Sequence, residues 1–187
     1  MTELPTDATG LWGYMSAEDV SFLRWAAQVP GIPGSILNVG CYKGLSCSVL
    51  ATVGRAPVVC VDPFDGKVPD YSPSFVPATR EEWEANMASC GIRDRILFFQ
   101  GYSGEVLPAL QRRGMRFKLA LIDGSHTYAD ALSDIGYARL MLNPGGILVV
   151  DDAMGFPDVT RALEASGEQW RKAGSKMAWT SVEPRKL

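Results

Sequence analysis

The sequence of 187 residues has only one histidine, His126, which excludes a metal site built from several histidines. Its four cysteines have no short paired spacing, so we expect buried, reduced thiols rather than a zinc site or a disulfide framework. No apolar run approaches the roughly 20 residues that a membrane span needs. Basic residues are not in excess, with 18 against 21 acidic ones. We therefore expect neither nucleic acid nor a membrane as a partner.

What the chain does have is the composition of a folded globular protein, with 47% hydrophobic and 21% charged residues. A chain of this length predicts a single domain. The first residues show no basic stretch followed by an apolar one. We therefore expect no signal peptide and a cytoplasmic location.

Short apolar runs alternate with helical patterns along the chain. Strands buried on both faces are predicted at residues 35–39, 57–61, 96–99, 118–122 and 146–150. Helices are predicted from residue 16, at 44–53, from residue 79, around 106–110, at 128–142 and at 157–165. This order predicts an α/β fold with a doubly wound, mostly parallel sheet and helices on both faces. Residues 176–182 predict a late strand, and residues 168–171 are a weak candidate for another.

The residues after the first predicted strand form a bend framed by Gly40 and Gly44. Glycine lets a ligand approach the backbone, and the following helix presents free N–H groups. Asp62 ends the second strand, 22 positions after Gly40, where its carboxylate can accept hydrogen bonds from two ribose hydroxyls. Taken alone, the bend is an ordinary strand-to-helix turn and Asp62 a solvated turn residue. Together, at the ends of neighbouring strands, they predict nucleoside binding.

The glycine spacing separates the nucleoside cofactors. A dinucleotide turn needs G-x-G-x-x-G, whereas this bend is G-x-x-x-G without a third glycine. The chain also lacks the G-x-x-x-x-G-K-[ST] pattern of a phosphate-binding loop. A nicotinamide-dependent oxidoreductase is therefore the less favoured enzyme, and a non-catalytic cofactor-binding module is the alternative outside enzymes.

Five motifs in order make the chain resemble the class I S-adenosylmethionine-dependent methyltransferases. They are NVGCYKGLS (38–46), VDPF (61–64), QGYS (100–103), LIDGSHTY (121–128) and NPGGILVVDD (143–152). The likeness is closest to small bacterial O-methyltransferases of the macrocin O-methyltransferase type. It implies a Rossmann-like methyltransferase fold and methylation of a hydroxyl on a small molecule, such as a natural product or a sugar. On this basis we expect an N-terminal helical cap (1–34), a cofactor-binding core (35–165) and a terminal strand region (166–187).

The resemblance also implies which residues hold S-adenosylmethionine. Gly40 and Gly44 would frame the methionine part, and Asp62 would hold the ribose. The adenine would pack on Phe64. The other expected contacts are Tyr42, Ser46, Gly101, Tyr102, Ser103 and Asp123. Asn38 stands where these enzymes usually have an acidic residue that helps to hold the cofactor's ammonium group, and its amide oxygen is the expected substitute.

Methyl transfer to a hydroxyl requires removal of a proton by a base or activation by a metal. Asp123, Asp151 and Asp152 follow the fourth and fifth strands, whose ends are adjacent in a parallel sheet, and three such oxygen ligands predict Mg²⁺. The alternative is a metal-independent methyltransferase, in which Asp151 and Asp152 cap a turn and Asp123 contacts the cofactor. The resemblance makes His126 the expected general base, and an imidazole suits that role. A histidine bonded to backbone at a helix start is the alternative for His126.

Aromatic residues are candidates for a dry roof over the acceptor. Trp12, Tyr14 and Tyr71 are the expected members, the last from the proline-rich loop at residues 65–78. The chain is short for the family that it resembles. A second copy that completes the pocket, and hence a homo-oligomer, is therefore one expectation.

Overall fold

The computed structural model describes residues 10–11, 13–67 and 75–183. The helices in these ranges are α1 (Ala17–Gln28), α2 (Leu45–Val53), α3 (Arg80–Ser89), the 3-10 turn η1 (Arg93–Arg95), α4 (Ser103–Arg112), α5 (Tyr128–Met141) and α6 (Pro157–Ala165). The strands are β1 (Ser35–Val39), β2 (Val58–Asp62), β3 (Ile96–Gln100), β4 (Phe117–Ile122), β5 (Leu142–Val150), β6 (Arg171–Ala173) and β7 (Met177–Ser181).

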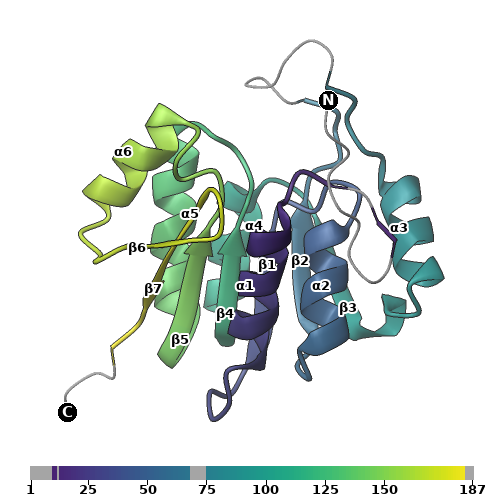
Figure 1. Cartoon of the computed structure of the whole chain (residues 1–187), viewed down its shortest axis with the longest axis horizontal. Helices are drawn as coiled ribbons and strands as arrows, with labels where there is room; N and C mark the ends of the chain where they lie inside the picture. Colours follow the sequence, from purple (N-terminus) through teal and green to yellow (C-terminus); the bar gives the residue numbers. More distant parts are fainter. Residues whose placement is uncertain (1–9, 12, 68–74, 184–187) are drawn as a thin grey trace.

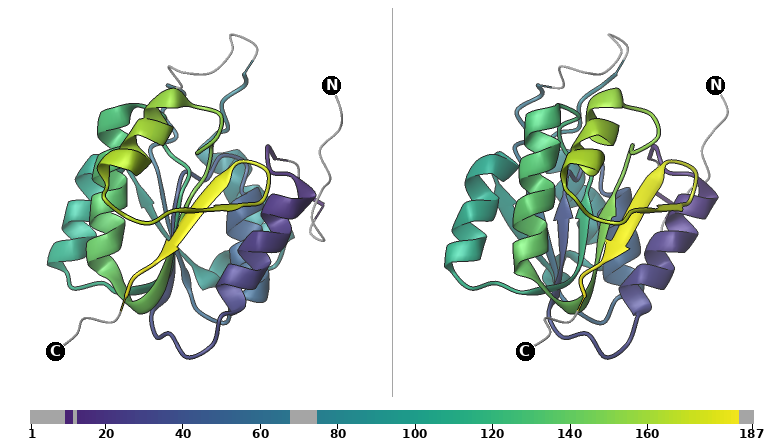
Figure 2. Two further views of the ribbon diagram at one scale, coloured as in Figure 1. Left: turned by 60° about the vertical axis from the view of Figure 1, so that its left-hand side comes forward. Right: turned by 90° about the vertical axis from the view of Figure 1, so that its left-hand side faces the viewer.

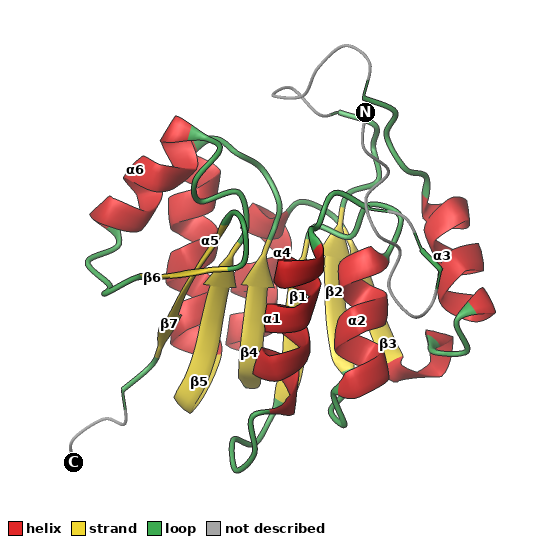
Figure 3. Ribbon diagram, in the orientation of Figure 1, coloured by secondary structure: helices red, strands yellow, loops and turns green. Residues whose placement is uncertain are grey.

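The strands form one seven-stranded sheet in the order β3-β2-β1-β4-β5-β7-β6. The neighbours from β3 to β5 are parallel, and β7 runs antiparallel to both β5 and β6. The order reverses between β1 and β4, and ligands of such sheets bind outside the carboxyl ends of the strands at this point. The loops of these ends gather along one edge of the sheet (Figure 3). The predicted doubly wound, mostly parallel sheet is confirmed.

Helices cover both faces of the sheet (Figures 1 and 2). One buried cluster joins the sheet to α1, α2 and α3, and includes Leu23, Leu50 and Trp83. The other joins it to α4, α5 and α6, and includes Leu110 and Ile135. Burial on both faces explains why the central strands are continuous apolar runs. Within the described ranges, no helix combines the length and the apolar character that a bilayer crossing requires.

The end of the chain differs from its sequence prediction. The two last strands are β6 and β7, and β6 begins at Arg171 rather than at residue 168. The residues before β6 are held at the end of α6, because the indole N–H of Trp170 donates to the carbonyl of Leu163 (3.0 Å). The helix predicted around 106–110 is also longer, since α4 continues through Pro108 with Leu107 fully buried.

The cysteines are free thiols, as expected. Cys41, Cys47 and Cys60 are buried between the sheet and α2, where Cys60 Sγ lies 3.4 Å from Cys47 Sγ. Cys90 is half-buried at the end of α3. Their shared apolar surroundings fit a role in packing.

Asp134 on α5 is a carboxylate in the apolar layer beneath the strand-end loops, with an exposed fraction of 1%. Burial raises its pKa to about 7, although the nearby hydroxyl of Ser103 opposes the rise. The folded state therefore keeps a proton on Asp134 that the unfolded chain releases near its ordinary pKa of about 4.

We expect stability to fall as pH rises from about 4 to about 7, because over this window the folded state binds the extra proton. At about 1.4 kcal/mol per pKa unit, the rise of about 3 units costs about 4 kcal/mol of stability above pH 7. Asp134→Asn should remove it, so that urea unfolding at pH 8 shows a more stable protein and a flatter pH profile. The exposed Asp94→Asn serves as control and should change neither. An unchanged profile in Asp134→Asn would show that Asp134 is ionised in the folded protein.

Candidate active site

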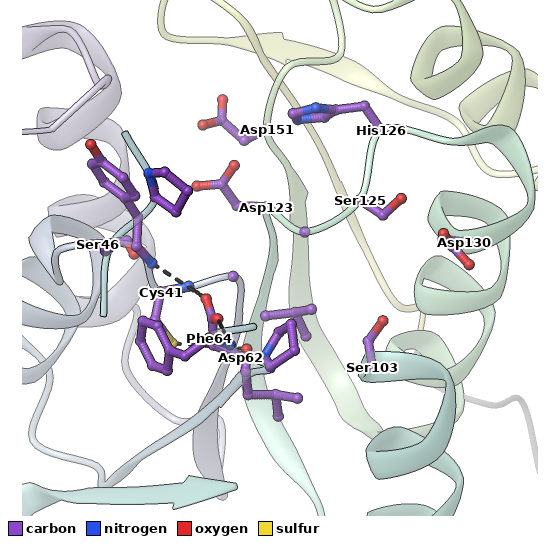
Figure 4. A pocket seen from close by; sticks show the side chains of 18 of the residues that line it. Cys41, Ser46, Asp62, Phe64, Ser103, Asp123, Ser125, His126, Asp130 and Asp151 are labelled. Carbon is purple, nitrogen blue, oxygen red and sulfur yellow. Dashed lines mark hydrogen bonds between the residues drawn. The ribbon is translucent and has the colours of Figure 1, made fainter. Parts of the chain in front are cut away.

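A cavity of about 600 Å³ lies at the carboxyl ends of the parallel strands. It is lined from the loops after β1, β2, β3, β4 and β5, as the topology requires. The predicted site residues on its wall are Gly40, Tyr42, Ser46, Asp62, Phe64, Gly101, Tyr102, Ser103, Asp123, His126, Asp151 and Asp152. Figure 4 shows Asp62, Cys41 and Phe64 gathered on one side, and Asp123, Asp151 and His126 on another. The glycine bend and Asp62 thus share one cavity with the acidic cluster.

Asp62 joins the loops after β1 and β2. Its Oδ2 accepts the backbone N–H groups of Cys41 (2.7 Å) and Tyr42 (3.4 Å), and its Oδ1 accepts that of Phe64 (2.8 Å). Burial raises the pKa of Asp62, although these bonds oppose the rise. A carboxylate has about four lone-pair positions, so Asp62 retains capacity to accept bonds from a ligand's hydroxyls.

Three residues with side chains adopt the left-handed backbone conformation, which is energetically unfavourable for them, at this cavity. Tyr42 (φ 46°), Phe64 (φ 46°) and Asp152 (φ 55°) are the non-glycine residues with left-handed backbone in the described ranges, and all three line it. Such conformations persist where the surrounding structure enforces them. Their clustering supports a functional role for this edge of the sheet.

Gly40 allows the loops after β1 and β4 to touch. It has φ 82°, and a Cβ built on it would lie 1.8 Å from the carbonyl oxygen of Asp123. No side chain fits there without moving the Asp123 backbone. The bend therefore needs glycine for close packing of two strand-end loops as well as for its conformation.

Two predicted cofactor residues lie outside the cavity wall. Asn38 is fully buried on the α2 side of β1, because successive strand residues point to opposite faces. Its Nδ2 donates to the carbonyl of Gly40 (2.8 Å) and to Cys47 Sγ (3.4 Å), so it holds the bend from beneath. Gly44 is the N-cap residue of α2, and a Cβ there would lie 2.2 Å from Met87 Cε, so it packs closely against α3.

The other side of the cavity holds an ion-pair network. Lys176 Nζ lies 3.0 Å from Asp151 Oδ2 and 2.8 Å from Asp152 Oδ1. His126 Nε2 lies 2.9 Å from Asp152 Oδ2. The sequence prediction brought the three aspartates and His126 together but missed Lys176, which lies far along the chain in the turn between β6 and β7.

Electrostatics separate the three carboxyl groups. Burial raises the pKa of Asp123, and the charge of Asp151 raises it further. Burial also raises the pKa of Asp151, to about 6, although Lys176 opposes the rise. Burial disfavours ionised Asp152 too, but the bonds from His126 and Lys176 outweigh it and keep its pKa below the ordinary value. Asp152 is therefore the carboxylate most firmly ionised beside His126.

The predicted Mg²⁺ ligands do not form a free set of oxygen donors. Both oxygens of Asp152 are engaged, by Lys176 and His126. Asp151 pairs with Lys176 through one oxygen and accepts the backbone N–H of Asp152 (2.8 Å) with the other. One ligand atom each of Asp123, His126 and Asp152 lie within 4.8 Å of one another, but Mg²⁺ prefers oxygen ligands throughout. As arranged, Asp151 and Asp152 hold an ammonium group in the place where Mg²⁺ was predicted.

An aromatic group covers part of the cavity. Tyr14, Tyr42 and Phe75 lie with ring centroids 5.3–5.8 Å apart, and all three line the wall. Tyr14 was an expected roof residue, whereas Trp12 and Tyr71 lie outside the described residues. The sequence alone did not predict that Tyr42 and Phe75 pack against Tyr14. These contacts depend on how residues far apart in the chain are brought together by the fold.

Comparisons with known proteins agree with this fold. A family model described as a methyltransferase domain matches residues 37–153. Solved structures with the same fold include the O-methyltransferase NovP (TM-score 0.77, 16% identity, 90% of this chain and 81% of that one). Another is cofactor-bound Rv0187 from MTB (TM-score 0.70, 22% identity, 97% of this chain and 85% of that one). A third is the O-methyltransferase TomG of Streptomyces achromogenes, solved with SAM (TM-score 0.67, 18% identity, 91% of this chain and 82% of that one). No curated protein sequence matches significantly.

Gly40→Ala tests the contact between the loops. We expect it to cost more than the 1–2 kcal/mol of a left-handed alanine, because its Cβ would also collide with Asp123. Gly31→Ala is the matched control, since Gly31 has φ 80° with no atom within 4 Å of the added Cβ. Urea unfolding of both variants gives the difference. Equal losses would mean that the two loops separate without cost.

Proposed function

The chain belongs to the methyltransferase-domain family, and from this membership we propose that it transfers the methyl group of S-adenosylmethionine to a hydroxyl group of a small molecule. One observation carries the proposal. A single cavity joins the strand-end loops around Asp62, which are proposed to bind the nucleoside, to the cluster around His126, which is proposed to act as acid and base. Its volume of about 600 Å³ is in the range of small-molecule sites.

The cofactor side would hold the nucleoside by the groups at the strand ends. Asp62 would accept hydrogen bonds from the ribose hydroxyls, since its carboxylate faces the cavity and is fixed by backbone N–H groups. Phe64 and the Gly101–Ser103 turn would enclose the adenine. Gly40 would let the methionine part approach the backbone, because glycine has no side chain.

The acid–base side would prepare the acceptor. The hydroxyl oxygen would accept the methyl group as the carbon–sulfur bond breaks and its electron pair stays on sulfur. The imidazole of His126 would take the hydroxyl proton. Asp152, 2.9 Å from His126 Nε2, would stabilise the resulting imidazolium. The ring of Phe156 stacks on that of His126 at 3.9 Å, which fixes the plane of the imidazole.

Oxygen is the proposed acceptor atom because two of the solved structures with this fold are O-methyltransferases and because a hydroxyl needs a base. A natural product or sugar remains the proposed acceptor class, as the resemblance implies. Of the two forms of the reaction, the arrangement supports the metal-independent one, since Mg²⁺ would have to displace Lys176 from Asp151 and Asp152.

Cofactor binding tests the Asp62 assignment. Calorimetric titration with S-adenosylhomocysteine should show one site, and Asp62→Ala should weaken it at least about 30-fold, or about 2 kcal/mol, through loss of charged hydrogen bonds to ribose. Asp94→Ala, on the exposed η1 turn, should bind as the parent does. An Asp62→Ala protein with parental affinity would refute the ribose assignment.

Transfer of a labelled methyl group to a panel of hydroxylated natural products and sugars tests the base. His126→Ala should reduce transfer about 10²–10⁴-fold. Its affinity for S-adenosylhomocysteine should stay within about threefold, because the histidine acts on the acceptor. If His126→Ala transfers the methyl group at the parental rate, His126 is not the general base and has a structural role only.

A further inference from the structure

Lys176 lies in the turn between β6 and β7 and reaches the cavity wall. Its side chain is 23% exposed, and its ammonium group bridges Asp151 and Asp152 at 3.0 and 2.8 Å. The second oxygen of Asp152 pairs with His126. One cation of the protein therefore sits within the group of carboxylates that was predicted to hold a metal.

A buried network holds the turn that carries Lys176. Asp19 of α1 is fully buried and accepts both the backbone N–H and the hydroxyl of Ser175 (2.7 Å each). Asp19 also accepts the backbone N–H and hydroxyl of Ser16 (2.8 Å each). Gly174 has φ 56°, and a Cβ there would lie 2.1 Å from Asp19 Oδ1. The start of α1 therefore fixes the residues immediately before Lys176.

We propose that Lys176 is a tethered cation that replaces a divalent metal ion in this site, an inference that rests on the proposed methyl transfer. Clustered carboxylates repel one another, and a neighbouring positive charge stabilises them. A metal ion must break the ion pairs of Lys176 with Asp151 and Asp152 before these carboxylates can bind it, whereas the ammonium group is already bound to them. The positive charge that balances the acidic cluster therefore comes from Lys176 of the chain itself.

The ammonium group also has a role toward the acceptor. It carries three N–H donors, of which Asp151 and Asp152 take two. The third donates to the acceptor oxygen and stabilises the negative charge that forms as the proton moves to His126. Lys176 keeps its own protons throughout. The ammonium group therefore stabilises the acceptor oxygen by its positive charge, as a metal ion acting as a Lewis acid would.

Metal binding provides a test that needs no acceptor. The full chain and its Lys176→Met and Lys172→Met variants are titrated with Mn²⁺, and free Mn²⁺ is measured by electron paramagnetic resonance. Lys172 lies on β6 and is exposed, so its variant is the matched control. We expect Lys176→Met to bind Mn²⁺ at least about tenfold more tightly than the other two proteins, because it leaves the carboxylates unbalanced.

Methyl transfer in excess chelator provides the second test. The parent and Lys172→Met should keep their rates within about twofold, whereas Lys176→Met should lose about 10²-fold and regain part of it when Mg²⁺ is added. Thermal melts establish that each variant is folded. If Lys176→Met does not fold, the parent alone decides, through its Mn²⁺ affinity and its rate in chelator.

The proposal is overturned if the parent binds one Mn²⁺ as tightly as Lys176→Met, or if chelator abolishes transfer by the parent. Failure of the proposed function looks different. In that case the parent binds no S-adenosylhomocysteine, or transfers methyl to no acceptor with or without Mg²⁺. The Mn²⁺ titration would then still decide whether Lys176 excludes a metal from the carboxylates.

Discussion

The hydrogen bonds of Asp62 are the constraint on which the site depends. One carboxylate accepts N–H groups from the loop after β1 and from the loop after β2, and so holds both at the edge where the strand order reverses. Gly40 lets the first of these loops rest on the loop after β4. Three strand ends are thereby brought to one cavity. A ligand that needs contacts from all of them finds them arranged before it binds, which reduces the ordering cost of binding.

The opposite side of the cavity follows from charge. Three aspartates at adjacent strand ends would repel one another in partly buried surroundings. The chain relieves this with Lys176, and with His126 beside Asp152. The same pairs that stabilise the carboxylates also orient the imidazole and keep a positive charge at the cavity. Stability and chemistry thus use the same groups, and Asp19 extends their support to the start of α1.

Much of the fold could be predicted from the sequence, because the signals are local. Apolar runs marked β1 to β5, but the prediction of burial on both faces was wrong for β3, an edge strand on which Leu97 is 49% exposed. Capping residues such as Ser16 and Thr79 marked helix starts. Where prediction was weaker, a distant contact decided. Trp170 donates a hydrogen bond to the end of α6, so β6 begins one residue later. Leu107 and Leu110 are buried against the sheet, so α4 extends beyond the short helix predicted around Pro108.

For the site, local sequence signals identified the side chains that follow the strand ends, and parallel topology was enough to bring Asp62, Asp123 and His126 to one edge. The sequence also placed Asn38 and Gly44 among the cofactor contacts, because a linear motif does not show which face of a strand or helix start is free. The folded chain was needed to show that Asn38 points under the bend, that Gly44 packs on Met87, and that Lys176 reaches the aspartates. The physical reason is that strand-end position is encoded locally, whereas charge pairing between residues far apart in the chain depends on how the last, antiparallel strand lies against the sheet.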